Sequence, residues 1–169
     1  MNLAQLNILQ AEAARINFER CCGARAWAEA MLRARPFADR AALHAAADRA
    51  ASTLARADWL EAFSHHPRIG DVAALRERFA ATAAWAGAEQ GGAVGAPDAV
   101  LEALAQGNRA YEARFGYVFI VCATGKRAGE MLAILESRLP NDPDLELEVA
   151  AVEQMKITRL RLDKLLEES

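Results

Sequence analysis

Apolar residues recur every three or four positions through most of the chain, and this period predicts amphipathic α-helices. The first such stripe contains Leu6, Leu9, Ala13 and Ile16 and predicts one helix that continues towards Arg20. Cys21-Cys22-Gly23 should break it, because glycine commonly ends a helix. The pattern as a whole predicts an all-α fold, a single compact domain of about eight helices over residues 1–169.

Residues that cap or interrupt helices predict the remaining boundaries. A second helix, with Trp27 and Met31 one turn apart, should stop near Arg35 because Pro36 restricts the residue before it. Four further helices are expected to begin at Asp39, Asp58, Asp71 and Pro97, and Asp58 would form a capping box with Glu61. Gly116 and Pro140 are expected to end two helices. Residues 87–97, with four glycines and a proline, predict the longest irregular segment.

Three stretches of the carboxyl-terminal half depart from a simple apolar stripe. Asn108 interrupts one, and a buried amide there should hydrogen-bond a neighbouring loop. Residues 117–123, Tyr-Val-Phe-Ile-Val-Cys-Ala, are too rich in β-branched and aromatic side chains for a surface helix and predict a buried run. A last helix should begin near Asp144; its expected apolar face is Leu145, Val149, Val152, Met155, Leu162 and Leu166, and Arg161 lies between Ile157 and Leu165 in an additional row.

Composition narrows the class of protein. The net charge is −3, and the twenty basic residues form no dense run, so nucleic acid is not an expected partner. The amino terminus lacks the pattern of a signal peptide, and no apolar span is long enough for a membrane helix. Three cysteines without a secretory signal predict reduced thiols and a cytoplasmic location.

The strongest chemical candidate is the segment His65-His66-Pro67. Histidine is the side chain that titrates nearest neutral pH, and Pro67 should hold His66 where a helix has just ended. Glu89-Gln90 and Arg161 could bind a polar or anionic ligand, although a solvated loop and an arginine whose stem covers apolar surface explain them equally well. The chain has no P-loop, HExxH, CxxC or GxSxG motif, and the sequence predicts neither a metal nor a cofactor.

Taken together, six segments resemble the 2-oxo-4-hydroxy-4-carboxy-5-ureidoimidazoline (OHCU) decarboxylases, which complete the route from urate to (S)-allantoin. The segments are Arg35-Pro36-Phe37, His66-Pro67 with Gly70, Glu89-Gln90, Asn108-x-x-Tyr111-x-x-Arg114-Phe115-Gly116, Phe119 to Ala123, and Lys156-Ile157-x-x-Leu160-Arg161-Leu162. The resemblance covers nearly the whole chain. It implies an all-helical homodimer that needs no cofactor and acts on a small ureidoimidazoline carboxylate.

The resemblance also implies roles for single residues. His66 is the expected catalytic histidine, whereas His65 has no counterpart in the motif. Substrate contacts are expected from Pro67, Glu89, Gln90, Phe119, Ile120, Val121, Cys122, Ala123 and Arg161. The position of Ala86 is also part of the expected pocket, but the family usually has a serine there, so one hydroxyl contact is missing or supplied elsewhere.

Two other functions remain open at this point. A helical module could bind a purine-like ureide or a partner helix without chemistry, and equal affinity for substrate and product without turnover would distinguish it. A ureide hydrolase would normally use a bound metal, which metal analysis would detect.

Overall fold

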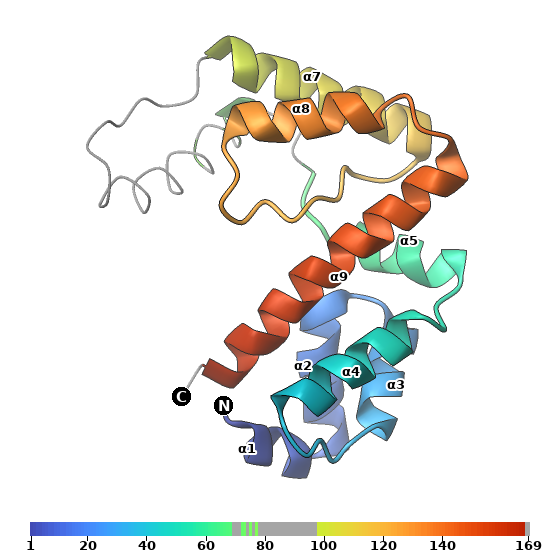
Figure 1. The fold of residues 1–169 in the computed structure, drawn as a ribbon, viewed down its shortest axis with the longest axis vertical. Coiled ribbons are helices and arrows are strands. Elements are labelled where there is room, and N and C mark those ends of the chain that lie inside the picture. The colour runs from blue at the N-terminus through green and yellow to red at the C-terminus, as the bar shows by residue number, and fades with distance from the viewer. Residues whose placement is uncertain (69–71, 74, 76, 78–97, 168–169) are drawn as a thin grey trace, which may run out of the picture. The chain divides into compact units, whose positions relative to one another are not determined.

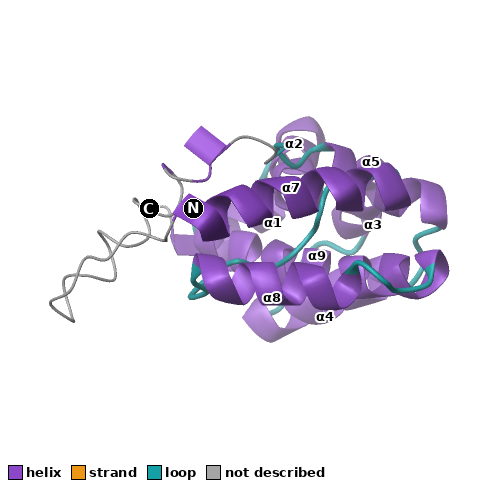
Figure 2. Cartoon of the chain, turned by 90° about the horizontal axis from the view of Figure 1, so that it is seen from above, coloured by secondary structure: helices purple, strands orange, loops and turns teal. Residues whose placement is uncertain are grey.

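The computed structural model describes residues 1–68, 72, 73, 75, 77 and 98–167, and within them all regular structure is α-helical (Figures 1 and 2). This confirms the all-α prediction. The described residues fall into two units. The first comprises residues 1–66, 120–122 and 147–169, and the second comprises residues 67–119 and 123–146. Whether the chain is a single domain, as the sequence predicts, stays a prediction. No described helix is both long enough and apolar enough to cross a membrane.

The first unit contains α1 (Leu3–Ile8), α2 (Ala11–Cys22), α3 (Arg25–Arg33), α4 (Arg40–Ala51), α5 (Arg56–Ser64) and most of α9 (Pro143–Glu167). Its core is aromatic: Phe18 contacts Trp27 and Phe37 edge to face at 6.2 and 6.3 Å, and Trp27 donates its indole N–H to Ala47 O at 3.1 Å. The α-amino group of Met1 donates to Leu165 O at 3.0 Å, so the two ends of this unit meet (Figure 1).

The prediction of a single helix over residues 6–20 is wrong, because the helix is interrupted between the end of α1 at Ile8 and the start of α2 at Ala11. Leu9 is extended, with φ −60° and ψ 140°. Contacts from a distant segment stabilise the break: Arg35 donates to Leu6 O and Leu9 O at 2.9 and 2.8 Å, and the Asn7 amide exchanges two hydrogen bonds with the backbone of Phe37. The carbonyls at the end of α1 therefore find partners that a continuous helix would not need.

Most of the other helix ends agree with the sequence. Gly23 follows α2 with φ 93°, Asp39 accepts from Ala42 N at 2.7 Å as the cap of α4, and Gly116 ends α7 with φ 81°. The predicted start at Asp58 is wrong. Asp58 lies in the first turn of α5 and accepts from Ala55 N at 2.8 Å, while Glu61 accepts from Arg25 N of α3.

The second unit contains α7 (Asp98–Phe115) and α8 (Ala128–Arg138), which lie side by side (Figures 1 and 2). Gly107 permits the close approach, since a Cβ there would lie 2.5 Å from a methyl group of Leu135. Asn108 does not reach a neighbouring loop as predicted; it donates to Leu104 O of its own helix at 2.9 Å. The predicted helix starts at Asp71 and Pro97 lie outside the described residues.

The run of residues 117–123 is largely buried, as predicted, and has no regular secondary structure. Tyr117 lies in the second unit, and Ile120, Val121 and Cys122 lie in the first. After Ala123 the chain turns at Gly125, where φ is 75° and Lys126 N donates to Ala123 O at 3.0 Å.

The predicted apolar face of α9 is largely wrong. Leu145 and Val152 are 51% and 58% exposed, and of the expected face only Leu162 is fully buried. The side chains that are fully or almost fully buried recur every fourth residue instead, and three of the five are polar: Glu146, Ala150, Gln154, Thr158 and Leu162. Hydrogen bonds to polar groups of neighbouring segments make this burial favourable, and a hydrophobic pattern does not report them.

Candidate active site

His66 lies immediately beyond the end of α5. The helix ends at Ser64, and His65 N and His66 N donate to Ala62 O and Phe63 O at 3.3 and 3.1 Å in a final tight turn. Pro67 cannot continue the helix, as the sequence predicts. His66 is partly buried whereas the neighbouring His65 is exposed, so the two adjacent histidines have different environments.

The imidazole of His66 contacts α9 through Gln154. His66 Nε2 lies 2.6 Å from Gln154 Oε1. The other end of the amide donates to Cys22 O and to Thr158 Oγ1, each at 3.3 Å. Thr158 in turn donates its hydroxyl to Gln154 O at 3.0 Å, and both side chains are fully buried. The sequence pattern did not predict Gln154 and Thr158. They lie seven and three residues before Arg161, and this helical spacing was the available signal.

Arg161 hydrogen-bonds the carboxyl-terminal end of α2, the same end that Gln154 contacts. Its guanidinium donates to Cys21 O at 3.2 Å and to Arg20 O at 3.4 Å, and the side chain remains partly exposed. The last carbonyls of a helix have no partners within it and carry its partial negative charge, so a cation is favourable there. Arg161 is thus held by backbone groups next to the Cys22 carbonyl that holds Gln154.

The segment 120–122 adjoins α9 one residue before Gln154. Cys122 N donates to Glu153 Oε2 at 2.8 Å, and Glu153 also pairs with Lys156. The residues Ile120, Val121 and Cys122 are only 1%, 8% and 9% exposed. The substrate contact expected of this segment would therefore come from its backbone groups. In the first unit, His66 and segment 120–122 therefore both contact α9, the helix that carries Arg161.

The other predicted residues belong to the second unit or lie outside the described residues. Pro67 is exposed and belongs to the second unit. Phe119 and Ala123 also belong to that unit; the Phe119 ring packs on Tyr111 at 5.1 Å, with the Arg138 guanidinium 4.7 Å from its centre. Ala86, Glu89 and Gln90 lie outside the described residues.

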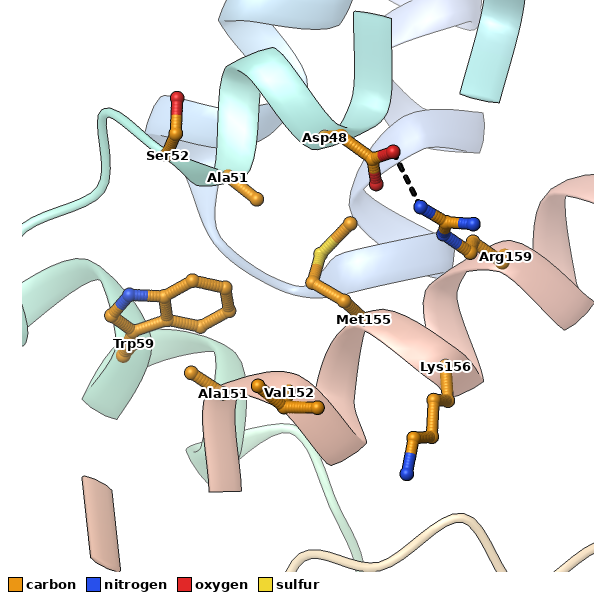
Figure 3. A pocket seen from close by; sticks show the side chains of 9 residues that line it. All are labelled: Asp48, Ala51, Ser52, Trp59, Ala151, Val152, Met155, Lys156 and Arg159. Atoms are coloured by element: carbon orange, nitrogen blue, oxygen red, sulfur yellow. Dashed lines mark hydrogen bonds and ion pairs between the residues drawn. The ribbon is translucent and has the colours of Figure 1, made fainter. Parts of the chain in front are cut away.

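A separate open groove of about 430 Å³ lies in the first unit (Figure 3). Trp59 and Met155 point towards it, and Asp48 pairs with Arg159 at its edge. None of the predicted site residues that the structure describes lines this groove, so it is distinct from the candidate site around His66. Among the described residues, no group of three or more His, Cys, Asp or Glu side chains is placed to hold a metal ion.

Comparison with known proteins identifies relatives of one kind. A family model described as OHCU decarboxylase matches residues 7–163. The uric acid degradation bifunctional protein TTL of Arabidopsis thaliana is 40% identical over 148 residues, which is 86% of this chain and 45% of that protein. A 2-oxo-4-hydroxy-4-carboxy-5-ureidoimidazoline decarboxylase of Amia calva is 38% identical over 60 residues, covering 36% of this chain and 34% of that protein. The chain thus matches less than half the length of both curated relatives.

Two solved structures have a similar fold. A crystal structure of OHCU decarboxylase in the presence of (S)-allantoin superposes with a TM-score of 0.71 and 35% identity, over 94% of this chain and 99% of that chain. A crystal structure of (S)-allantoin synthase superposes with a TM-score of 0.70 over 97% of this chain and 54% of that chain, and at 22% identity it supports the fold alone.

Proposed function

Because the chain belongs to the OHCU decarboxylase family, we propose that it converts OHCU to (S)-allantoin and carbon dioxide in urate degradation. The observation that carries the proposal is the family match over residues 7–163, which includes His66 and Arg161. The contact between His66 and α9 supports it further, because a proton-transferring side chain must be held in a fixed orientation.

The proposed substrate provides its own electron sink. Its carboxylate and hydroxyl share one ring carbon beside a carbon–nitrogen double bond. When the bond to the carboxylate breaks, carbon dioxide leaves and the electron pair moves into that double bond, giving an ene-diamine. The ring nitrogen and the adjacent ring carbon each then gain a proton. One comes from solvent and the other balances the proton lost by the hydroxyl as it becomes the carbonyl of allantoin; the face of the carbon that is protonated sets the handedness. The reaction therefore balances without an added oxidant, reductant or organic cofactor.

His66 is the proposed proton carrier in this reaction. It hydrogen-bonds the substrate hydroxyl or carboxylate and moves a proton as the carboxylate leaves. Arg161 provides a fixed cation for the substrate anion, and backbone groups of residues 119–123 stabilise the delocalised charge. By the family resemblance, Pro67 walls the pocket, and Glu89 and Gln90 bind the ureido and ring amides. Ala86 stands where the family usually has a serine, so one hydroxyl contact is missing or supplied elsewhere.

A coupled assay tests this proposal. The substrate is generated from urate with the two upstream enzymes, and circular dichroism follows the formation of optically active allantoin, since uncatalysed decay gives the racemate. His66→Asn should lose the signal by at least about a hundredfold, the usual scale of acid–base catalysis. His65→Asn is the matched control, because His65 is exposed and absent from the family motif; it should retain activity.

Three results would contradict the proposal. Full activity of the His66→Asn variant would remove the assignment of the proton carrier. Binding of OHCU and allantoin with equal affinity and without turnover would favour a ureide-binding module instead. Activity that depends on a bound metal would favour a hydrolase.

The assembly and location are also proposals. The family resemblance supports a homodimer, and Val152 and Leu160, which are 58% and 46% exposed on α9, are candidates for its interface. None of the three cysteines is in a disulfide, which is compatible with a reducing cytoplasm. Light scattering on the purified protein measures the oligomeric state.

A further inference from the structure

The amide of Gln154 occupies a site where its two ends are not interchangeable. One end faces Cys22 O and Thr158 Oγ1 at 3.3 Å, and the other faces His66 Nε2 at 2.6 Å. The side chain is fully buried. A reversed amide would therefore have no water to replace the hydrogen bonds that it lost.

The chemistry of two neighbours fixes the orientation. A backbone carbonyl only accepts hydrogen bonds, so Cys22 O requires the NH₂ end of the amide. The hydroxyl hydrogen of Thr158 is directed to Gln154 O at 3.0 Å, so the hydroxyl offers a lone pair to the same NH₂ group. Reversing the amide would place its oxygen against the carbonyl oxygen of Cys22, and neither of these oxygens can donate a hydrogen bond to the other.

The orientation of Gln154 determines which nitrogen of His66 is protonated. The amide oxygen faces Nε2, and an oxygen acceptor at 2.6 Å requires a hydrogen on that nitrogen. A neutral imidazole carries a single N–H, so the lone pair is then on Nδ1. We propose that Gln154, oriented by Thr158 and the carbonyl at the end of α2, fixes the Nε2–H tautomer of His66 in which the ring takes part in proton transfer. This inference rests on the proposed function.

A neutral acceptor suits a residue that must both take up and release a proton. A carboxylate at position 154 would stabilise the imidazolium and raise the pKa of the histidine. An amide orients the ring and selects its tautomer without adding charge. Gln154 is thus a positioning residue, which acts on the substrate only through His66.

Nitrogen-15 NMR of the histidine-labelled protein tests the tautomer without any substrate. At a pH where the ring is neutral, Nε2 of His66 should have the chemical shift of a protonated nitrogen and Nδ1 that of an unprotonated one. The His66→Asn variant assigns the signals. A protonated Nδ1 with an unprotonated Nε2 would overturn the proposal.

Variants of Gln154 and Thr158 test its consequence. Gln154→Met, of similar volume, should give averaged shifts from mixed tautomers and lower kcat roughly 10- to 100-fold, the usual cost of losing an orienting contact, with KM little changed. Thr158→Val removes the hydroxyl without changing the shape of the side chain and should lower kcat by less than Gln154→Met does. Thr158→Ser keeps a hydroxyl at this position and should keep a kcat close to that of the wild type. If Gln154→Met fails to fold, the Thr158 pair and the wild-type spectrum still decide.

The two proposals fail in different ways. Wild-type protein with a protonated Nε2 but no decarboxylation of OHCU would refute the proposed function and leave the tautomer assignment intact. An active enzyme in which Gln154→Met and Thr158→Val keep both the wild-type shifts and the wild-type kcat would refute the role of Gln154 alone.

Discussion

At the scale of single residues, Cys21 and Cys22 show how burial controls reactivity. Both lie at the end of α2 and are 3% and 0% exposed. Burial, which disfavours the thiolate, raises the pKa of both thiols, that of Cys21 to about 12, although the nearby Arg161 guanidinium opposes the shift at Cys21. These thiols are therefore protonated at neutral pH and are not nucleophiles.

The raised thiol pKa predicts a loss of stability at alkaline pH. The ordinary pKa of a cysteine thiol is 9.0, and burial raises the pKa of Cys21 to about 12, so the folded state holds the proton more tightly than the unfolded chain does. The stabilisation is complete below pH 9.0 and is lost as pH rises towards about 12. Urea denaturation of the protein and of a Cys21→Ala variant, at several pH values from neutral to about 11, measures it.

The variant isolates the contribution of the thiol. All other ionisable groups are the same in the two proteins, so the difference between their curves reports the Cys21 thiol. The free energy of unfolding should fall more steeply with pH in the wild type than in Cys21→Ala. Parallel curves would show that burial of this thiol does not govern the alkaline limit.

At the scale of elements, α9 is organised by a row of buried side chains of which three of five are polar. In the first unit this row holds Gln154 and Thr158 against His66 and α2. In the second unit it begins with Glu146, which is fully buried and accepts from Tyr111, from Arg138 at 2.6 and 2.8 Å, and from Asn141 at 2.7 Å. Burial and the bond to Glu146 also raise the pKa of Tyr111.

Neutralising Glu146 should destabilise the protein. Glu146→Gln leaves the buried Arg138 guanidinium without its counter-charge, and breaking a buried pair costs about 3–5 kcal/mol. The matched control is Glu148→Gln, an exposed position on the same helix, which should change the free energy of unfolding by less than about 0.5 kcal/mol. Urea denaturation measures both, and similar values for the two variants would argue against the network.

At the scale of the whole molecule, neither unit is a continuous stretch of chain. The chain passes between the units after residues 66, 119, 122 and 146, and α9 contains the last of these points. The end of α2 and His66, which follows α5, obtain a partner from α9 that lies 132 and 88 residues later in the chain, as the contacts of Cys22 and His66 with Gln154 show. Both units contain residues of α9, the last helix of the chain, so neither unit can form all of its contacts before α9 has folded.

We therefore expect thermal unfolding in a single transition, with coincident curves from far- and near-ultraviolet circular dichroism. A fragment of residues 1–66 should not fold cooperatively by itself, because it lacks the helix that satisfies the end of α2 and buries its apolar surface. A cooperative transition of that fragment, or two separated transitions of the intact chain, would contradict this expectation.

Much of the fold could be predicted because several helix boundaries are local. Gly23, Asp39 and Gly116 act on the backbone next to them through positive φ values or a side-chain cap, and no distant residue is needed. The predicted start at Asp58 is wrong because a local pattern can have two meanings. An aspartate can cap the helix that follows it, or it can lie in the first turn and accept from the N–H of the residue before the helix, as Asp58 does from Ala55.

The candidate site could be predicted in part. His66 was found because a histidine before a proline at a helix end is visible in the sequence and matches a family motif. Gln154 was missed because it lies in a helix whose apolar residues suggested another buried face. An amide becomes a buried partner only when an imidazole and a backbone carbonyl converge on it, and these come from positions 66 and 22.

By itself the sequence determined the helical class, several helix boundaries, the family and the candidate histidine, since each depends on residues close together or on a pattern of residue types. Tertiary structure alone decided the break between α1 and α2, the face that α9 buries and the partner that orients His66. These depend on which polar groups meet across distant parts of the chain, and a buried polar side chain is favourable only where such a partner is in place.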